Sequence, residues 1–309
     1  MRHRVTRVFF IAAAVAGCVF IAAAVAGCAS VPPQEDARHA GWQMRIGNGT
    51  AATFAEVDAT GRPTRIGVVL SPDALDGLPA GSDMHHCTGR SKDGSAGAGA
   101  QCEQTFEHVL ALPDVVARRA DMPFKWVLLN WNPKGHIPPG IYDRPHFDVH
   151  FEIAPVAEVF AIEPGECGPE RVRCDQFAIA KKPVPANYVH PDFKDVDGVV
   201  PAMGNHLVDL TGDEFRGHPF TRSFIYGVYD GRVIFYEAMV TREFLLSKPD
   251  GCTPIKLPQA YAVAGYYPTV TCTRHDPRTG AYSISMEKFV LRTASPPAAS
   301  AGQAQKRIG

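Results

Sequence analysis

No charge of one sign predominates in this sequence. Its 309 residues include 31 Lys and Arg against 32 Asp and Glu, so the formal net charge is −1 at pH 7. A strongly basic chain would point to nucleic acid, because that partner is bound largely through Lys and Arg contacts to phosphates. The balanced charge leads us to expect no nucleic-acid partner.

Several familiar catalytic and cofactor motifs are also missing. The chain has no C-x-x-C pair, no H-E-x-x-H helix motif, no phosphate-binding loop and no C-x-x-C-H haem motif. The DGSAG segment at 93–97 only resembles the nucleophile elbow of a hydrolase. The segment 192–198 fails the calcium-loop pattern, because Phe193 stands at its first ligand position. These absences argue against zinc knuckles, zincin proteases, P-loop enzymes and covalent haem proteins.

The N-terminus has the pattern of a bacterial export signal. A basic segment, MRHRVTR, precedes an apolar run in which the nonapeptide FIAAAVAGC occurs twice, at 10–18 and 20–28. A basic start, an apolar stretch and small residues before a cleavage point are typical of such signals. A Cys directly after the small residues resembles the lipidated Cys of a lipoprotein. Cys18 and Cys28 both fit, and we favour Cys28 because polar residues follow it.

We therefore expect a lipoprotein signal peptide over 1–27, lipidation at Cys28 and a tether over 28–40. The protein would be exported and anchored by lipid in the cell envelope, facing the periplasm if the host is Gram-negative. Stable attachment by lipid takes more than one acyl chain. The alternative is a transmembrane anchor over 8–27, a run about long enough to span a bilayer.

The cysteine count agrees with export. Removing Cys18 with the signal and assigning Cys28 to lipid leaves six of the eight cysteines, an even number that favours three disulfides in an exported chain. Six cysteines allow 15 pairings, and the spacing favours neighbours. A disulfide between neighbouring cysteines closes a short loop, and this stabilises the folded state by about 3 kcal/mol in the chain-entropy model. The expected pairs are Cys87 with Cys102, Cys167 with Cys174, and Cys252 with Cys272.

The body of the chain is predicted to be mainly β. Short runs of β-branched and aromatic residues recur between turn signals, a pattern typical of an antiparallel barrel or sandwich. One or two short helices are expected, at 114–120 and 241–246. Asp230 and Gly231 between two apolar runs predict a hairpin turn. The expected strands lie within 42–48, 50–58, 64–71, 104–112, 124–131, 146–154, 158–163, 222–231, 232–241 and 283–292.

We expect one disulfide-bonded, β-barrel-like domain of unknown function over 41–292. The segment 293–309 is rich in Pro, Ala and Ser and shows no apolar period. Such a composition buries little apolar surface, so a disordered tail is expected there.

The densest chemistry lies between 131 and 151, in WNPKGHIPPGIYDRPHFDVHF. If HFDVHF is a strand, His146, Asp148 and His150 share one face and the three apolar residues share the other. Same-face neighbours are about 6.6 Å apart at a rise of ~3.3 Å per residue. An i, i+2 pair can therefore share an ion, whereas His146 and His150, about 13 Å apart on a flat strand, do so only if the strand is bulged.

One pair, His146/Asp148 or Asp148/His150, is thus expected to join ligands from elsewhere in the chain. His206 in MGNHLVD is the best outside donor, followed by His136 after Gly135. Glu237 is a third candidate, since it is an acidic residue inside an apolar strand.

Three interpretations of this cluster stay open. The favoured one is a divalent metal site, with zinc as the ion that best suits imidazole, although other transition ions accept mixed nitrogen and oxygen ligands. The second is a buried hydrogen-bond network without an ion. The third is metal-free acid–base catalysis by histidine, for which no paired nucleophile is evident.

Five ordered segments resemble a family of uncharacterised exported bacterial proteins, a domain of unknown function. The resemblance covers about two thirds of the mature chain and implies a β-barrel that self-assembles, and hence a homo-oligomer. It also implies that the six candidate ligands form one constellation, but it implies no reaction. The chain departs from the family pattern at Ala238, where Pro is expected. It also departs in its added cysteines and in the long insert around 167–196. The segments are ALDGLP at 74–79, WNPKGHIPPGIY at 131–142, PHFDVHF at 145–151, VPAMGNHLVD at 200–209 and FIYGVYDGRVIFYEAMVT at 224–241.

Three functions are compatible with the sequence. The first is a membrane-anchored lipoprotein that binds a divalent metal, or an unknown small ligand through it, at a His/carboxylate site. The second is a metal-dependent, cupin-like enzyme with an open coordination position. The third is a self-assembling envelope protein with a metal-free His/Asp network.

Overall fold

The computed structural model describes residues 37–80, 106–169 and 171–298. The predicted signal peptide, both candidate lipidation sites and the predicted Cys87–Cys102 pair lie outside the described residues. Residues 28–36 of the predicted tether and 299–309 of the predicted tail lie outside them as well.

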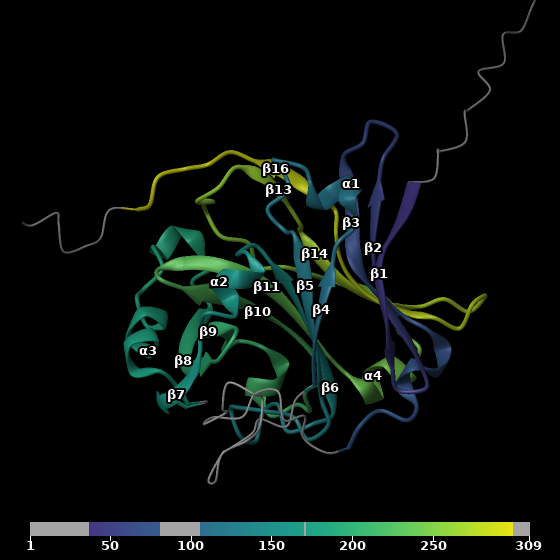
Figure 1. Ribbon diagram of the computed structural model, residues 1–309, viewed down its shortest axis with the longest axis horizontal. Helices are drawn as coiled ribbons and strands as arrows, with labels where there is room; N and C mark the ends of the chain where they lie inside the picture. The colour runs from purple at the N-terminus through teal and green to yellow at the C-terminus, as the bar shows by residue number, and fades with distance from the viewer. Residues whose placement is uncertain (1–36, 81–105, 170, 299–309) are drawn as a thin grey trace, which may run out of the picture. The chain divides into compact units, whose positions relative to one another are not determined.

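Two antiparallel sheets form the framework of the described chain (Figure 1). The six-stranded sheet has the order β1 (Ala37–Ile46), β2 (Gly49–Val57), β3 (Pro63–Leu70), β15 (Tyr282–Glu287), β14 (Val270–His275) and β12 (Asp250–Pro254). The seven-stranded sheet has the order β4 (Phe106–Ala111), β5 (Trp126–Asn132), β6 (His146–Glu152), β11 (Arg232–Thr241), β10 (Arg222–Tyr229), β9 (Gly204–Asp209) and β8 (Phe193–Val200).

The remaining elements are short. β13 (Gly265–Tyr267) pairs with β16 (Val290–Arg292), and β7 covers Pro164–Cys167. The α-helices are α1 (Asp114–Ala117), α2 (Val156–Val159), α3 (Cys174–Ala180) and α4 (Arg242–Leu246). The 3-10 turns are η1 (Pro72–Leu75), η3 (Ala186–Tyr188) and η4 (Asp213–Arg216).

One continuous apolar core joins the inner faces of the two sheets. It includes Ile66 and Ile284 from the six-stranded sheet and Phe147, Val149 and Phe151 from the seven-stranded sheet, all 1% exposed or less. The sheets are separate and do not close on each other, so the predicted β class is confirmed in its sandwich form rather than as a barrel.

The outer face of the seven-stranded sheet is also covered. In Figure 1, α2 and α3 lie on the side of this sheet that faces away from β1, β2 and β3. Val159 of α2 packs with Leu128 of β5 and Phe235 of β11, and Tyr142 of the β5–β6 loop packs with Ile225 of β10. Polar side chains on this face are therefore enclosed rather than solvated.

The predicted helices are present, and two others were not foreseen. α1 and α4 lie within 114–120 and 241–246, and the Thr241 hydroxyl caps α4 by accepting from the Phe244 N–H at 3.1 Å. The strand predicted at 158–163 is wrong. Helix α2, which begins after Pro155 and ends at Val159, covers the start of that segment. Its buried residues Val159 and Ile162 are spaced three apart, which suits a helical turn rather than a strand.

Several strands differ from the prediction in their limits. β1 begins at Ala37, inside the segment predicted as tether, because it pairs with β2 up to Val57. The run at 283–292 is split into β15 and β16 by Lys288, whose φ is +55°. Strands β7, β8, β9, β12, β13 and β14 were not predicted. The hairpin at Asp230-Gly231 is present, and both residues have positive φ.

The start of the predicted tail is tied to the domain. The Tyr188 hydroxyl donates to the Ser295 carbonyl at 2.7 Å, and the Ser295 N–H donates to the Tyr261 carbonyl at 2.9 Å. Ser295, near the start of the predicted tail, therefore has defined partners in the domain.

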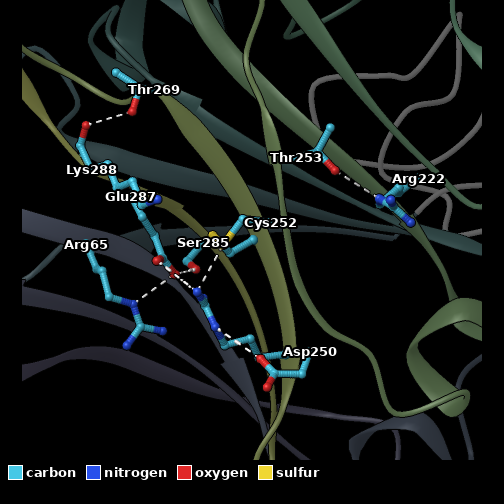
Figure 2. Close-up of a disulfide and its surroundings, with 11 residues drawn as sticks. Arg65, Arg222, Asp250, Cys252, Thr253, Thr269, Ser285, Glu287 and Lys288 are labelled. Carbon is cyan, nitrogen blue, oxygen red and sulfur yellow. Dashed lines mark hydrogen bonds and ion pairs between the residues drawn. A yellow bond between two sulfur atoms is a disulfide. The ribbon is translucent and has the colours of Figure 1, made fainter.

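Two of the three expected disulfides fall within the described residues, and both join neighbours as predicted. Cys167 bonds Cys174 across β7 and α3, and Cys252 bonds Cys272 across β12 and β14. Figure 2 shows Cys252 beside Glu287 and Ser285 of β15. Disulfides are typical of exported proteins.

None of the helices formed by the described residues has both the length and the apolar character needed to cross a membrane.

Candidate metal centre

Strand β6 lies near the middle of the seven-stranded sheet and presents its polar residues on the covered outer face. His146, Asp148 and His150 alternate with the core residues, as the sequence predicted, and are 3% exposed or less. β5 pairs with one edge of β6 and β11 with the other, so that Glu237 of β11 stands directly opposite His150. The register thus places an acidic partner beside the second histidine.

The first group of candidate ligands consists of His136, His146 and Asp148. His136 Nε2 lies 3.2 Å from Asp148 Oδ2, and His146 Nε2 lies 3.1 Å from Asp148 Oδ1. The two imidazole rings meet edge to face with centroids 4.7 Å apart. Asp148 Oδ2 also accepts a hydrogen bond from Asn132 Nδ2 at 2.6 Å, which fixes the orientation of the carboxylate.

The second group consists of His150, His206 and Glu237. His150 Nε2 lies 3.6 Å from Glu237 Oε2, and His206 Nε2 lies 3.8 Å from the same oxygen. The three side chains come from β6, β9 and β11. In each group, one ligand atom from every residue lies within 4.8 Å of the others.

Each of the four histidines places Nδ1 against a main-chain carbonyl oxygen. A carbonyl oxygen can only accept, so Nδ1 must carry a proton, and in neutral imidazole Nε2 then has the free lone pair. Metal-binding histidines commonly hold their other ring nitrogen in this way, because the hydrogen bond fixes the tautomer and the ring. The carbonyls facing His136, His146, His150 and His206 belong to Ile137, Arg144, Leu128 and Gly198, at 2.7, 2.6, 3.2 and 2.7 Å respectively.

In the neutral form of this tautomer, each of the four Nε2 lone pairs faces a carboxylate oxygen, whereas a protonated ring donates Nε2–H to that oxygen. Two acceptors in contact repel each other unless a proton or a cation lies between them. Four of the buried atoms concerned have no hydrogen-bond partner among the described residues: His146 Nε2, Asp148 Oδ1, His150 Nε2 and Glu237 Oε2. Buried polar atoms without partners are rare in folded proteins and indicate a missing ion, a missing water or a functional role.

The two groups differ in their electrostatics. Burial, followed by the charge of His150, lowers the pKa of His206 to about 3, and burial likewise lowers the pKa of His150. Burial, followed by the charges of Asp148 and Glu152, raises the pKa of Glu237 well above its ordinary value. At neutral pH this group therefore holds two neutral imidazoles and a carboxyl group that ionises readily only beside a cation.

In the first group, burial alone would raise the pKa of Asp148. The charges of His146 and His136, together with their hydrogen bonds, outweigh burial and hold that pKa well below its ordinary value. Asp148 is therefore an anion in the folded protein. An anion is the form in which a carboxylate binds metal.

Gly227 on β10 allows the second group to assemble. It stands between His206 on β9 and Phe235 on β11, and a Cβ at this position would lie 2.1 Å from the Phe235 ring. The ring uses the space and packs against His150 and His206, with centroids 4.8 and 5.3 Å away. The missing side chain also lets His206 approach Glu237 although β10 lies between their strands.

The loop between β5 and β6 returns His136 to the end of β6. Gly135 has φ +77°, and a Cβ there would lie 2.0 Å from the Tyr142 carbonyl oxygen. The His136 N–H donates to the same carbonyl at 3.3 Å. Only glycine fits this close approach, so Gly135 positions His136 over the first group.

A cavity of about 580 Å³ adjoins both groups. His136 and Asp148 from the first group and His150 and His206 from the second line it, whereas His146 and Glu237 do not. Each group therefore has two of its three candidate ligands on the wall of the cavity.

The sequence identified all six clustered residues, but not their division into two groups of three. The expected distance between His146 and His150 along the strand explains the division, because each joins a different partner set. The single constellation implied by the family resemblance is thus two adjacent groups.

Sequence reasoning missed two buried residues on the same face. Asn132 orients Asp148, and its place opposite His146 follows only from the β5–β6 register. Glu152 continues the alternation two residues after His150, a signal that was available in the sequence. Its carboxylate oxygens have no hydrogen-bond partner among the described residues, and burial, followed by the charge of Glu107, raises its pKa well above the ordinary value.

A third set of close ligand atoms, Cys252, Cys272 and Glu287, is not a metal site. Its two sulfur atoms form a disulfide and cannot act as thiolate ligands.

Comparisons of the chain with protein-family models, with curated proteins and with solved structures found no match.

Proposed function

We propose that this protein binds two divalent metal ions, with zinc as the preferred ion, through His136/His146/Asp148 and His150/His206/Glu237. The observation that supports this most is that His146 Nε2, Asp148 Oδ1, His150 Nε2 and Glu237 Oε2 are buried without hydrogen-bond partners among the described residues, while main-chain carbonyl oxygens occupy the histidine Nδ1 atoms. A cation between each set of facing atoms would remove the repulsion and satisfy the four partnerless atoms of the two groups.

The distances agree with this proposal. Zinc binds imidazole nitrogen and carboxylate oxygen at about 2.0–2.2 Å, so two tetrahedral ligands lie about 3.3 Å apart. The nitrogen-to-oxygen contacts of 3.1 and 3.2 Å in the first group and 3.6 and 3.8 Å in the second lie on either side of that value. Small side-chain adjustments would complete either site.

A metal-dependent enzyme is the second candidate. Catalytic zinc sites have three protein ligands and an open fourth position, and each group here offers three ligands beside a cavity. Under this alternative the bound ion would activate water or polarise a substrate oxygen. The metal-free hydrogen-bond network is less well supported. Such a network would pair its buried polar atoms, whereas four atoms of the two groups have no hydrogen-bond partner among the described residues.

We further propose that the protein is exported and held to the membrane by lipid on Cys28. The basic and apolar N-terminal pattern and the two disulfides of the domain support this location. Membership of the uncharacterised exported family, and self-assembly into a homo-oligomer, also remain proposals that rest on the ordered motifs.

Zinc stoichiometry tests the metal-binding proposal. We expect the purified protein to bind two zinc ions in competition with a chromophoric chelator. His136→Ala and His206→Ala should each bind one, because each removes a ligand from a different group. The double variant should bind none.

The matched control is His218→Ala, which removes an exposed histidine outside both groups and should leave two ions bound. Circular dichroism establishes that each variant is folded. If His136→Ala and His206→Ala bind as much zinc as His218→Ala, or if the wild type binds none, the proposal is wrong.

A further inference from the structure

The walls of the cavity beside the two metal groups are of two kinds. One wall presents His136, Asp148, His150 and His206. The remainder is mostly apolar and comes from the β5–β6 loop and from β8, β9 and β10. Its side chains include Tyr142, Val196, Val200, Met203, Val208 and Ile225.

The size of the cavity suits an organic ligand. Pockets for small molecules commonly measure about 300–1,000 Å³, are mainly apolar and have a few polar groups that fix the orientation. The volume of about 580 Å³ lies well inside that range. A site for metal-bound water alone would not need so large an apolar wall.

The charge of the loaded site selects the kind of ligand. Two divalent ions bring four positive charges, and Asp148 and Glu237 supply two negative charges, so the loaded groups carry a net charge of +2. Lys134 adds a positive charge to the lining and has no ion pair with any described residue. The nearby Asp197 shares Lys181 Nζ, at 3.0 Å, with Asp195, at 2.6 Å, and its charge is smaller than that of the two ions.

From these observations we infer that the cavity binds an amphiphilic organic anion. Its carboxylate or similar oxygen group coordinates the metal ions at their open positions, and its hydrocarbon part packs against the apolar wall. This inference rests on the proposed metal binding and names the class of ligand that the loaded site accepts.

The two ends of the ligand are held by different forces. Hard oxygen donors bind zinc, and the low polarity of the cavity strengthens the attraction between the ions and an anion. Burying the chain contributes about 0.8 kcal/mol per methylene group. Affinity should therefore need both the charge and the chain.

Isothermal titration calorimetry with octanoate tests the inference on the full chain. We expect octanoate to bind the protein loaded with two zinc ions at least tenfold more tightly than the metal-free protein. Acetate, which lacks the chain, and methyl octanoate, which lacks the charge, should each bind at least tenfold more weakly than octanoate.

A pair of enlarged side chains tests the location. Val196→Phe adds volume at the cavity wall, and Val263→Phe makes the same change at a site that is 54% exposed and outside the cavity. Compared at equal zinc loading, Val196→Phe should weaken octanoate binding at least tenfold relative to Val263→Phe.

The outcomes separate this inference from the proposal on which it rests. Zinc binding without zinc-dependent octanoate binding overturns the inference and leaves metal binding intact, as does equal binding of methyl octanoate. Equal octanoate affinity in the two Phe variants overturns the location. Failure to bind zinc overturns both proposals.

Discussion

At the scale of single residues, the candidate metal centre depends on a glycine as well as on its candidate ligands. Gly227 leaves room for the Phe235 ring, which in turn packs against both imidazoles of the second group. A substitution at Gly227 should therefore weaken metal binding although Gly227 is not itself a candidate ligand.

We predict that Gly227→Ala lowers the free energy of unfolding by roughly 1–3 kcal/mol, the usual cost of adding volume to a packed core. It should also weaken zinc binding at the His150/His206/Glu237 group, because the displaced ring supports two of its ligands. Urea denaturation and zinc titration measure the two effects.

Gly251→Ala is the control for this substitution. Gly251 is also in a strand, but a Cβ there meets no atom within 4 Å. Equal stability and equal zinc affinity of the two variants would contradict the role assigned to Gly227.

The alternation of residues along β6 could be predicted from the sequence, because a strand has a fixed period of two. His206 and Glu237 were also foreseen as outside donors. Their assignment to His150 rather than to His146 could not be foreseen, because it depends on which strands flank β6 and in which register. The position of Asn132 beside Asp148 could not be foreseen either, because it depends on the register between β5 and β6.

At the scale of elements, the Cys252–Cys272 disulfide attaches an edge strand. β12 pairs only with β14 in its sheet, and all five of its residues are exposed. The two cysteines stand directly opposite each other in that ladder. Little apolar burial holds β12 in place, so the covalent bond matters there.

We predict that the double variant Cys252→Ser/Cys272→Ser loses about 3 kcal/mol of unfolding free energy, because the bond closes a loop with a sequence separation of 20. Cys167→Ser/Cys174→Ser should lose less, roughly 2 kcal/mol, because its separation is 7. Urea denaturation of the two variants compares them, and a larger loss from the shorter loop would count against this explanation.

A charged network beside β12 and β15 should make stability depend on pH (Figure 2). Glu287 accepts hydrogen bonds from Arg65 Nε at 2.9 Å and Ser285 Oγ at 2.7 Å, and it also pairs with Arg274. Burial alone would raise the pKa of Glu287, but Arg274, Ser285 and Arg65 outweigh it and hold the pKa below its ordinary value of 4.5.

Because the folded-state pKa lies below the unfolded one, this stabilisation is fully present above about pH 4.5 and is lost as the pH falls through the folded value. Glu287→Gln should therefore be less stable than the wild type at pH 7, by roughly 1–3 kcal/mol for hydrogen bonds to a charged group. The difference should shrink below pH 4. A difference that stays constant from pH 7 to pH 3 in urea denaturation would refute the assignment.

Most strands rich in β-branched and aromatic residues could be located from the sequence, as with 64–71 and 232–241. β12 was missed because its residues, DGCTP, have turn character and rely on pairing and the disulfide. The strand expected at 158–163 became α2, because Pro155 and the burial of Val159 and Ile162 favour a helical turn.

At the scale of the whole molecule, the sequence predicted the β class but not the choice between a barrel and a sandwich. Local patterns set where strands occur and which face is apolar. The choice depends on long-range pairings, such as β15 with β3 and β11 with β6, which join segments far apart in the chain.

The seven-stranded sheet has two buried faces with different roles. The inner face packs against the other sheet, and the outer face encloses both metal groups and the cavity. The ligands come from β6, β9, β11 and the β5–β6 loop, so bound ions would link segments from 136 to 237. The central claim is therefore that this outer face is built around two metal ions.

Anomalous diffraction from crystals grown with zinc tests that claim most directly. We predict two peaks in the map recorded at the zinc absorption edge, one within about 2.0–2.2 Å of ligand atoms from His136, His146 and Asp148 and the other equally near His150, His206 and Glu237. A map with no peak at either group, in crystals that bind zinc elsewhere on the protein, would contradict it.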